Sequence, residues 1–297
     1  MLGIHKLLII YCDYGRLGNR LHTHANALAW CIENNYNLMN LSFNEYAHFF
    51  KNSQKHKSGN FHQHENFLFK SLSSRVFINF LRRLLLSDKW LKRLAWIIKQ
   101  VRPTDNEVLS EADLNCQISH KKINLIKYWD ISCSHSIKKH QDKLRDYLRP
   151  SIRFEASSEK IIDELRSKYD YVVGVHARRG DYAIYLDGKY YHSWESYLHW
   201  ANQTKQVLEK SGKKNVGVVI CSDEEPPTSI PKRQTVHFNS SNEIMVDIHI
   251  MSLCDYNVGP PSSFGTWISW FGKVPRLVVY NNTEITSLEQ FKVCTTC

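Results

Sequence analysis

The stretch HARRGDY, residues 176–182, carries two adjacent arginines and an aspartate. It directly follows YVVGV, residues 171–175, an apolar and β-branched run that predicts a buried strand. Ligands of an open α/β sheet bind beyond the carboxyl ends of its strands. Because a guanidinium is a planar fork of donors that matches phosphate oxygens, Arg178 and Arg179 are candidates for a diphosphate clamp. The alternative is an Arg–Asp pair in a surface turn.

Three further segments could join this site. GRLGNR, residues 15–20, follows a first predicted strand at 4–12, and its glycines let the backbone approach a ligand closely. Ser222 and Asp223 follow a predicted strand at 215–221, where the carboxylate could orient an arginine or accept from a ribose or base. Ser262 and Ser263 open a predicted helix, whose free amides and serine hydroxyls suit an anion. For each segment the alternative is a turn or helix-capping role.

Composition limits the class of protein. With 297 residues, 42% hydrophobic and 23% charged, the chain has the length and balance of a globular protein with two domains. A formal charge of +10 favours an anionic partner: a phosphate-bearing substrate, a nucleic acid or an anionic membrane. No apolar run suits a signal peptide or a membrane span. The eight scattered cysteines suggest reduced thiols in the cytoplasm, and the terminal CTTC at 294–297 is expected to be a frayed tail.

Strands and helices are expected to alternate along both halves of the chain. A helix at 21–32 and a strand at 36–43 complete a Rossmann-like opening after the 4–12 strand. After Arg149-Pro150, helices at 157–168, 194–210, 243–253 and from 262 alternate with strands at 171–175, 215–221, 256–259 and 276–280. The expectation is therefore two domains, residues 1–150 and 151–297.

The N-terminal half also contains two unusual segments. Residues 51–66 are polar and rich in histidine, which predicts a mobile loop. Residues 70–102 combine many lysines and arginines with apolar residues at helical spacing, which predicts one or two basic amphipathic helices inserted in the first domain. Such helices either bind an anionic membrane surface or pack on their own domain with a solvated basic face.

Together these motifs resemble those of the alpha-1,2-fucosyltransferases, glycosyltransferase family 11. HARRGDY is similar to the family's His-x-Arg-Arg-Gly-Asp-Tyr signature, and CSDEEP (221–226) to its Ser-Asp-Asp segment. Asp247 begins an Asp-x-x-x-Met-x-x-Cys match, and SSFGTWISWFG (262–272) resembles the Ser-Ser-Phe-x-x-Trp stretch. GRLGNR is similar to the N-terminal loop of this family and of protein O-fucosyltransferases. The motifs stand in family order, whereas residues 45–145 match none.

The resemblance implies a GT-B-like α/β fold of two Rossmann-like domains facing across a cleft. It also implies GDP-fucose as the donor, an inverting mechanism and no metal cofactor. By position, Arg178 would be the catalytic residue, holding the β-phosphate. The donor site implied by the same matches comprises Gly18, Asn19, His176, Arg178, Arg179, Asp181, Ser222, Asp223, Asp247, Ser262, Ser263 and Phe264. Within it, Asp247 would bind guanine or fix the loop that does.

The base that takes the acceptor proton stays open. Asp13, His22, His24, Glu45 and Asp181 are all eligible, although the neighbouring guanidiniums suit Asp181 better to bracing an arginine. The sequence departs from the family pattern where Arg20 replaces Gln, where Gly265-Thr266 replaces Ser-Trp, and at Pro260-Pro261. These departures bear on the acceptor and the linkage.

The expected function is transfer of L-fucose from GDP-fucose to a glycan hydroxyl, alpha-1,2 to a galactoside. The acceptor would be an oligosaccharide or a lipid-linked glycan, in the cytoplasm or at the inner face of the membrane, with no nucleic acid involved. Alternatives are a transferase for another GDP-sugar or a peptide acceptor, a nucleic-acid-binding protein, and a non-catalytic nucleotide or glycan binder.

Overall fold

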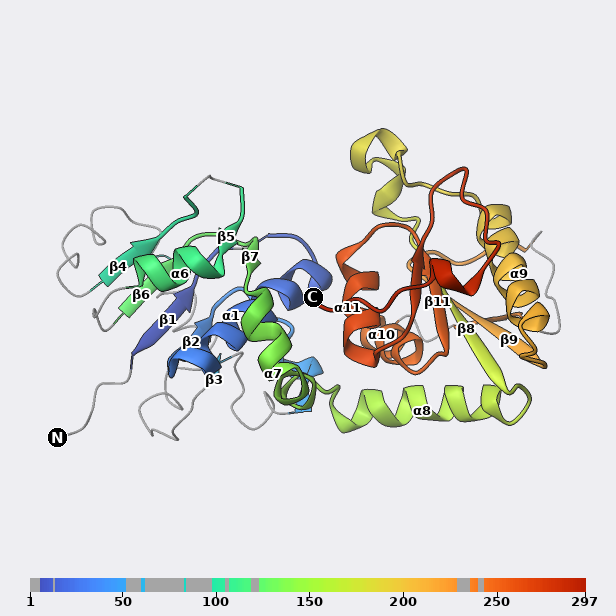
Figure 1. Cartoon of the computed structure of the whole chain (residues 1–297), viewed down its shortest axis with the longest axis horizontal. Helices are drawn as coiled ribbons and strands as arrows, with labels where there is room; N and C mark the ends of the chain where they lie inside the picture. Colours follow the sequence, from blue (N-terminus) through green and yellow to red (C-terminus); the bar gives the residue numbers. More distant parts are fainter. Residues whose placement is uncertain are drawn as a thin grey trace. The chain divides into compact units, whose positions relative to one another are not determined.

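The computed structural model describes residues 6–12, 14–51, 60–61, 83, 98–104, 107–118, 123–228, 236–239 and 243–297. The chain divides into two compact units. Unit 1 is Met1–Ser151 with Thr296–Cys297, and unit 2 is Ile152–Thr295. In Figure 1 the colours run from blue to green through residues 1–151 and from green to red through residues 152–297.

Unit 1 is built on a five-stranded sheet in the order β3-β2-β1-β6-β4. Its strands are β1 (Leu7–Ile10), β2 (Asn37–Asn40), β3 (Asn60–Phe61), β4 (Ile98–Val101) and β6 (Ile123–Ile126). All pairs are parallel except β2 with β3. The central strand β1 is buried along its whole length, as a parallel strand covered on both faces must be. β5 (Leu109–Ser110) and β7 (Ile131–Ser132) form a separate parallel pair.

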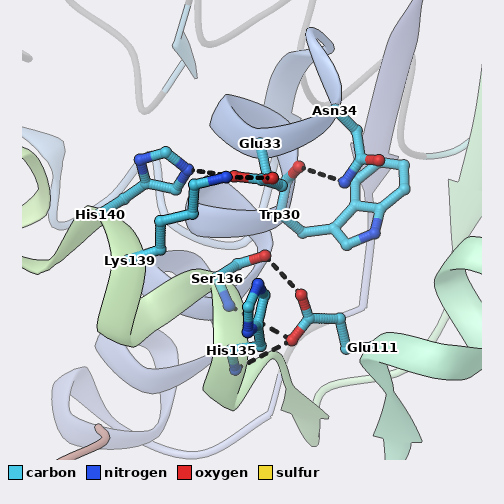
Figure 2. A network of polar contacts seen from close by, with 8 residues as sticks. All are labelled: Trp30, Glu33, Asn34, Glu111, His135, Ser136, Lys139 and His140. Carbon is cyan, nitrogen blue, oxygen red and sulfur yellow. Dashed lines mark hydrogen bonds and ion pairs between the residues drawn. The ribbon is translucent and has the colours of Figure 1, made fainter.

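Helix α1 (Leu17–Asn34) follows β1 and packs against α7 (Ser134–Tyr147). Polar contacts hold α7 in place, as Figure 2 shows. The Glu33 carboxylate lies 2.7 Å from Lys139 Nζ and 2.6 Å from His140 Nε2. Glu111, at the start of α6 (Glu111–Gln117), accepts hydrogen bonds from the first turn of α7, including the Ser136 hydroxyl at 2.5 Å. These contacts fix α1, whose first turn carries Gly18 and Asn19.

Unit 2 contains an all-parallel sheet in the order β10-β9-β8-β11-β12. Its strands are β8 (Tyr171–Ala177), β9 (Val216–Ser222), β10 (Val236–Phe238), β11 (Tyr256–Gly259) and β12 (Arg276–Val278). The chain first builds outward from β8 to β10 and then returns to place β11 on the other side of β8. The strand order therefore reverses between β8 and β11, which is where a doubly wound sheet opens a ligand crevice at its carboxyl edge.

Four helices cover the two faces of this sheet: α8 (Ile152–Arg166), α9 (Trp194–Lys210), α10 (Ile244–Ser252) and α11 (Ser263–Gly272). The side chains of Val173, Val175 and Ala177 join α9 in one apolar core. Because side chains alternate along a strand, His176 points to the opposite face, towards α11. In Figure 1 the strands accordingly lie between α9 on one side and α10 and α11 on the other.

Three local predictions were wrong. Residues 98–101, expected at the end of a basic helix, form β4, because this β-branched segment pairs with β6 and Pro103 follows. Residues 60–61, expected in a loop, form β3. The C-terminal tail is not frayed: Cys297 is 4% exposed, and its carbonyl accepts a 2.8 Å hydrogen bond from Asn26.

The rest of the predicted basic helical segment and most of the predicted loop lie outside the described residues. All eight cysteines are free. Among the helices that the structure describes, none is both long and apolar enough to cross a membrane.

Candidate functional site

Arg178 follows β8 and presents a guanidinium that is engaged on one side. Its Nε and Nη2 donate to the two carboxylate oxygens of Asp181 at 3.0 and 2.8 Å. The guanidinium also lies 4.7 Å from the centre of the Tyr182 ring. A guanidinium has five N–H donors, and among the described residues the Nη1 group of Arg178 donates to none, so it is available to a ligand. The side chain is 18% exposed, which combines access with a partly dehydrated surrounding that strengthens electrostatic attraction.

Arg179 is engaged at every nitrogen of its guanidinium. Nε donates to Glu224, Nη1 to the His192 carbonyl, and Nη2 to the Tyr191 hydroxyl. Its guanidinium also lies over the Trp194 ring, 5.3 Å from the centroid. Arg179 is therefore a buried clamp for the loop, whereas its neighbour Arg178 faces outward.

The segment that ends β9 fixes the backbone of the arginine loop. The Asp223 carboxylate accepts from the backbone N–H groups of Arg179 and Gly180, at 2.8 and 3.1 Å. Gly180 allows this approach, since a Cβ there would lie 3.0 Å from the same carboxylate. Ser222 accepts from the Glu224 N–H and so stabilises the turn. Ser222 thus stabilises the turn and Asp223 braces the backbone of the arginine loop.

The loop between β11 and α11 lies against the arginine loop. The Tyr182 hydroxyl donates to the Pro261 carbonyl at 2.5 Å. Ser262 is the N-cap of α11 and accepts from the Gly265 N–H at 3.0 Å. The Ser263 hydroxyl has no hydrogen-bond partner among the described residues, and the side chain is partly exposed. Of the two serines, Ser262 caps the helix and Ser263 is available to a ligand at the helix N-terminus.

His176 and Phe264 stack beneath this loop, with ring centroids 4.5 Å apart. Burial, assisted by Arg178 and Arg276, holds the pKa of His176 well below its ordinary value, so the imidazole is neutral. Its Nδ1 is buried and finds no partner among the described residues. The absence of a side chain at Gly259 makes this packing possible, because a Cβ there would lie 2.9 Å from His176.

Asp247 on α10 lies at the carboxyl ends of β9 and β10. It accepts hydrogen bonds from Asn239, which follows β10, and from the Cys221 thiol at the end of β9. Burial raises the pKa of Asp247 to about 6, against these hydrogen bonds. An acceptor carboxylate at this edge suits a base with N–H donors, such as guanine.

Arg276, the first residue of β12, was not among the predicted site residues. Its guanidinium is buried and donates from Nη2 to the Pro260 carbonyl at 2.6 Å. The signal in the sequence was an arginine at the start of a strand that is otherwise apolar, RLVVY. The predicted site residues from 176 to 264 thus gather at the carboxyl edge of one sheet, with Arg276 joining them.

Gly18 and Asn19 belong to unit 1. Both lie in the first turn of α1, beyond the carboxyl end of β1, and Asn19 packs against Gly15, whose φ of +65° favours glycine. Arg20 donates to the Ser42 carbonyl at 2.7 Å and pairs with Glu45 at 2.8 Å. The departure from the family's Gln at position 20 therefore ties this loop to the end of β2.

The eligible bases have very different surroundings. His24 is fully buried, and burial lowers its pKa to about 3. Glu45 and Asp181 are each paired with an arginine. His22 is 31% exposed, and its Nε2 lies 3.8 Å from an Asp130 carboxylate oxygen. Burial lowers the pKa of His22, while Asp130 and the backbone of Ile131 oppose the shift. Asp13 lies outside the described residues.

Solved structures with a similar fold include fucosyltransferases. A mutant of Arabidopsis thaliana FUT1 in complex with GDP gives a TM-score of 0.59 at 14% identity, covering 95% of this chain and 72% of that one. NodZ alpha-1,6-fucosyltransferase soaked with GDP-fucose gives 0.53 at 13%, covering 94% and 97%. POFUT1 in complex with GDP gives 0.52 at 12%, covering 93% and 99%. No curated protein sequence matches the chain.

These similarities, together with two α/β units that are each built on a mainly parallel sheet, define a GT-B-like fold, as the motifs had implied. The sequence model of Glycosyl transferase family 11 matches residues 5–287, so the chain belongs to this family and is a glycosyltransferase. Both the resemblance and the fold class drawn from the sequence are confirmed.

Proposed function

We propose that this glycosyltransferase moves L-fucose from GDP-fucose to a glycan hydroxyl, with inversion at the anomeric carbon and without a metal ion. The observation that carries the proposal is the guanidinium of Arg178, braced on one side by Asp181 and open on the other, at the point where the strand order of unit 2 reverses. The motifs shared with family 11 and the GDP or GDP-fucose named for similar structures support the same donor.

In this proposal unit 2 holds the nucleotide. Arg178 binds the β-phosphate, Ser263 and the first turn of α11 bind the diphosphate, and Asp247 accepts from guanine. Arg179, Asp223, Ser222 and Ser262 shape the two loops through the contacts described above. As the glycosidic bond breaks, negative charge grows on the β-phosphate. Arg178 therefore stabilises the transition state more than the bound donor.

We assign acceptor binding to unit 1, and the family motifs give Gly18 and Asn19 of this unit a role in recognising the donor. Among the candidate bases that the structure describes, His22 is the one that is partly exposed and has a carboxylate beside it. We assign His22 the role of the general base that takes the proton from the acceptor hydroxyl, and Asp130 stabilises the imidazolium that forms. The acceptor is an oligosaccharide or a lipid-linked glycan, and an alpha-1,2 linkage to a galactoside follows from the family motifs alone.

Charge balance at the diphosphate comes from arginine and helix N–H groups in this mechanism. Within the described ranges, no group of three His, Cys, Asp or Glu could hold a metal ion. The proposed site of action is the cytoplasm or the inner face of the membrane.

The first experiment is a thermal-shift titration with GDP-fucose, GDP-mannose, GDP, UDP-galactose and UDP-glucose, each with EDTA. A ligand that binds only the folded state raises the melting temperature by mass action. We expect GDP and GDP-fucose to stabilise the protein in EDTA, followed by transfer in an acceptor screen. A response to UDP-sugars alone, or only with added metal, would overturn the donor and the mechanism. Salt-dependent oligonucleotide binding without a response to GDP would instead indicate a nucleic-acid-binding protein.

The base is tested separately with His22→Gln and with His199→Gln as a matched control, an exposed histidine on α9. His22→Gln should lower transfer about 10²–10⁴-fold with GDP affinity unchanged. The wild-type rate should fall at acidic pH, below the ordinary histidine pKa of about 6.5, and this limb should vanish in the variant. A His22→Gln enzyme as fast as the control would remove His22 from the mechanism.

A further inference from the structure

Arg276 is a buried cation beneath the loop that leads into α11. Arg276 is 6% exposed. Among the described residues, its side chain makes one hydrogen bond, to the Pro260 carbonyl at 2.6 Å. Burial lowers its pKa from the ordinary arginine value, although an arginine remains charged at neutral pH. The molecule therefore places a permanent charge behind the Pro260–Pro261–Ser262 turn.

This charge lacks the partner that buried charges normally have. No carboxylate forms an ion pair with Arg276 in the part of the chain that the structure describes. The groups that act on it electrostatically are the tyrosines Tyr182 and Tyr280 and the Cys294 thiol. Removing a cation from water without an anionic partner is unfavourable by several kcal/mol. An anion that binds only in a complex would supply the missing negative charge.

Gly265 makes room for the guanidinium. A Cβ at this position would lie 2.5 Å from both Cζ and Nη2 of Arg276. Gly265 is also the position at which this sequence departs from the Ser of the resembling family motif. In this chain, the space of a side chain in the first turn of α11 is thus taken by an arginine from the neighbouring strand.

A second buried polar group lies in the same place. His176 Nδ1 is buried without a partner among the described residues, and Arg276 contributes to the lowered pKa of this histidine. The N-terminus of α11 adds the partial positive charge of its free N–H groups, with the Ser263 hydroxyl beside them. Cation, helix terminus and buried imidazole converge behind one turn, and their common complement is a phosphate-bearing ligand.

We infer that Arg276 is a second positive charge of the diphosphate site, acting through the Pro260–Ser262 turn, and that the bound diphosphate is the anion that balances it. The inference rests on the proposed donor site and adds to it a positioning residue from β12. It predicts that Arg276 lowers the stability of the free protein and raises its affinity for the diphosphate portion of the donor. A purely structural role, holding the Pro260 carbonyl, predicts neither effect.

Arg276→Gln and Arg276→Lys form a matched pair, because both retain a donor for the Pro260 carbonyl and only lysine retains the charge. Arg153→Gln serves as a control, since Arg153 is 73% exposed on α8 and pairs with Glu243. Affinities for GDP and for guanosine are measured by calorimetry, and melting temperatures are measured without ligand. Guanosine carries the base and sugar without the diphosphate, so it reports on the rest of the site.

We expect Arg276→Gln to lose about tenfold or more in GDP affinity while its guanosine affinity stays unchanged. Its melting temperature without ligand should equal or exceed that of the wild type. Arg276→Lys should retain GDP affinity within about threefold, because its charge remains. Equal GDP affinities in the two variants, or equal losses for GDP and guanosine, would overturn the inference. If the wild-type protein binds no GDP, the proposed function itself is wrong, and this result differs from the two outcomes that overturn the inference about Arg276.

Discussion

Replacing Arg178 by alanine is the most direct test of the proposed donor site. The structure gives this residue two effects. Its open Nη1 group is available to the β-phosphate, and its Nε and Nη2 neutralise Asp181 through a two-point contact of 3.0 and 2.8 Å. Alanine removes the donor and leaves a carboxylate facing the phosphate, so both changes weaken binding and transfer.

The loss of the donor is the larger of the two effects. Removing one preorganised donor to a developing oxyanion lowers kcat about 10²–10³-fold, or about 3–4 kcal/mol. Asp181 lies one hydrogen bond behind the guanidinium, and a phosphate oxygen would lie about 3 Å beyond it, so the two anions would be about 6 Å apart. At an effective dielectric constant of about 20 their repulsion is about 3 kcal/mol. Because the Asp181 side chain is 28% exposed, solvent reduces this to about half.

The repulsion predicts an effect that the loss of a hydrogen-bond donor alone does not: removing the charge of Asp181 should restore part of the lost GDP affinity. Arg178→Ala should lower kcat about 10²–10³-fold. It should also lower GDP affinity about a hundredfold, about tenfold from the lost hydrogen bond and about tenfold from the repulsion, because 1.4 kcal/mol corresponds to a factor of ten. Adding Asp181→Asn should restore only the tenfold in GDP affinity that comes from the repulsion. The assays are calorimetry for GDP affinity and GDP release for turnover with GDP-fucose. Arg153→Ala is the control for loss of a positive charge elsewhere in unit 2.

Near-normal turnover by a folded Arg178→Ala protein would refute the assignment of Arg178 to the β-phosphate. An Arg178→Ala/Asp181→Asn protein that binds GDP no better than Arg178→Ala would refute the electrostatic argument. In that case Asp181 would act only as a structural brace of the loop.

Arg179→Ala should lower the free energy of unfolding by about 2–4 kcal/mol, measured in urea, because three hydrogen bonds of a buried guanidinium are lost. A change below about 1 kcal/mol would contradict its role as a clamp. Burial raises the pKa of Asp247 to about 6, above the ordinary aspartate value of about 3.9 in the unfolded chain. The folded protein is therefore most stable below about pH 4, where Asp247 is protonated in both states, and it loses stability as pH rises through 6. The free energy of unfolding of Asp247→Asn should therefore rise relative to that of the wild type by up to about 3 kcal/mol between pH 4 and 7. Urea unfolding at several pH values measures this difference, and a difference that does not change with pH would contradict the prediction. GDP affinity of the wild type, measured by calorimetry, should fall as Asp247 is protonated below about pH 6. Gly265→Ala should lower stability by about 1–3 kcal/mol in thermal unfolding, because its Cβ would collide with Arg276, and an unchanged melting temperature would show that the guanidinium moves aside.

The pattern of apolar runs was sufficient to predict most of the strands and helices of unit 2. Val172, Val173 and Val175 precede a turn segment and form the centre of β8, as expected. The fold class followed from the same alternation. The segments that failed were those whose structure depends on a neighbour. Residues 98–101 form a strand because β6 lies beside them, and Cys297 is buried because the end of the chain packs on unit 1.

Sequence motifs also found the segments of the candidate site, since Arg178, Arg179, Ser262 and Ser263 were identified from residue type and position. The motifs could not predict which member of each pair contacts a ligand and which has a structural role. Arg179 is a clamp because Glu224, His192 and Tyr191 reach it from distant positions, and Ser262 is a cap because it alone precedes the first turn of α11.

By itself, then, the sequence determined most of the order of strands and helices in unit 2, the family, and the residue types that gather at the carboxyl edge of the second sheet. Periodicity and short motifs are local properties, and local properties can be inferred from neighbours along the chain. Only the tertiary structure decided which arginine is open to a ligand and that Arg276 lies beneath the same loop. Those outcomes depend on hydrogen-bond partners and space supplied by remote segments: a guanidinium from β12 fits beneath α11 because Gly265 has no side chain.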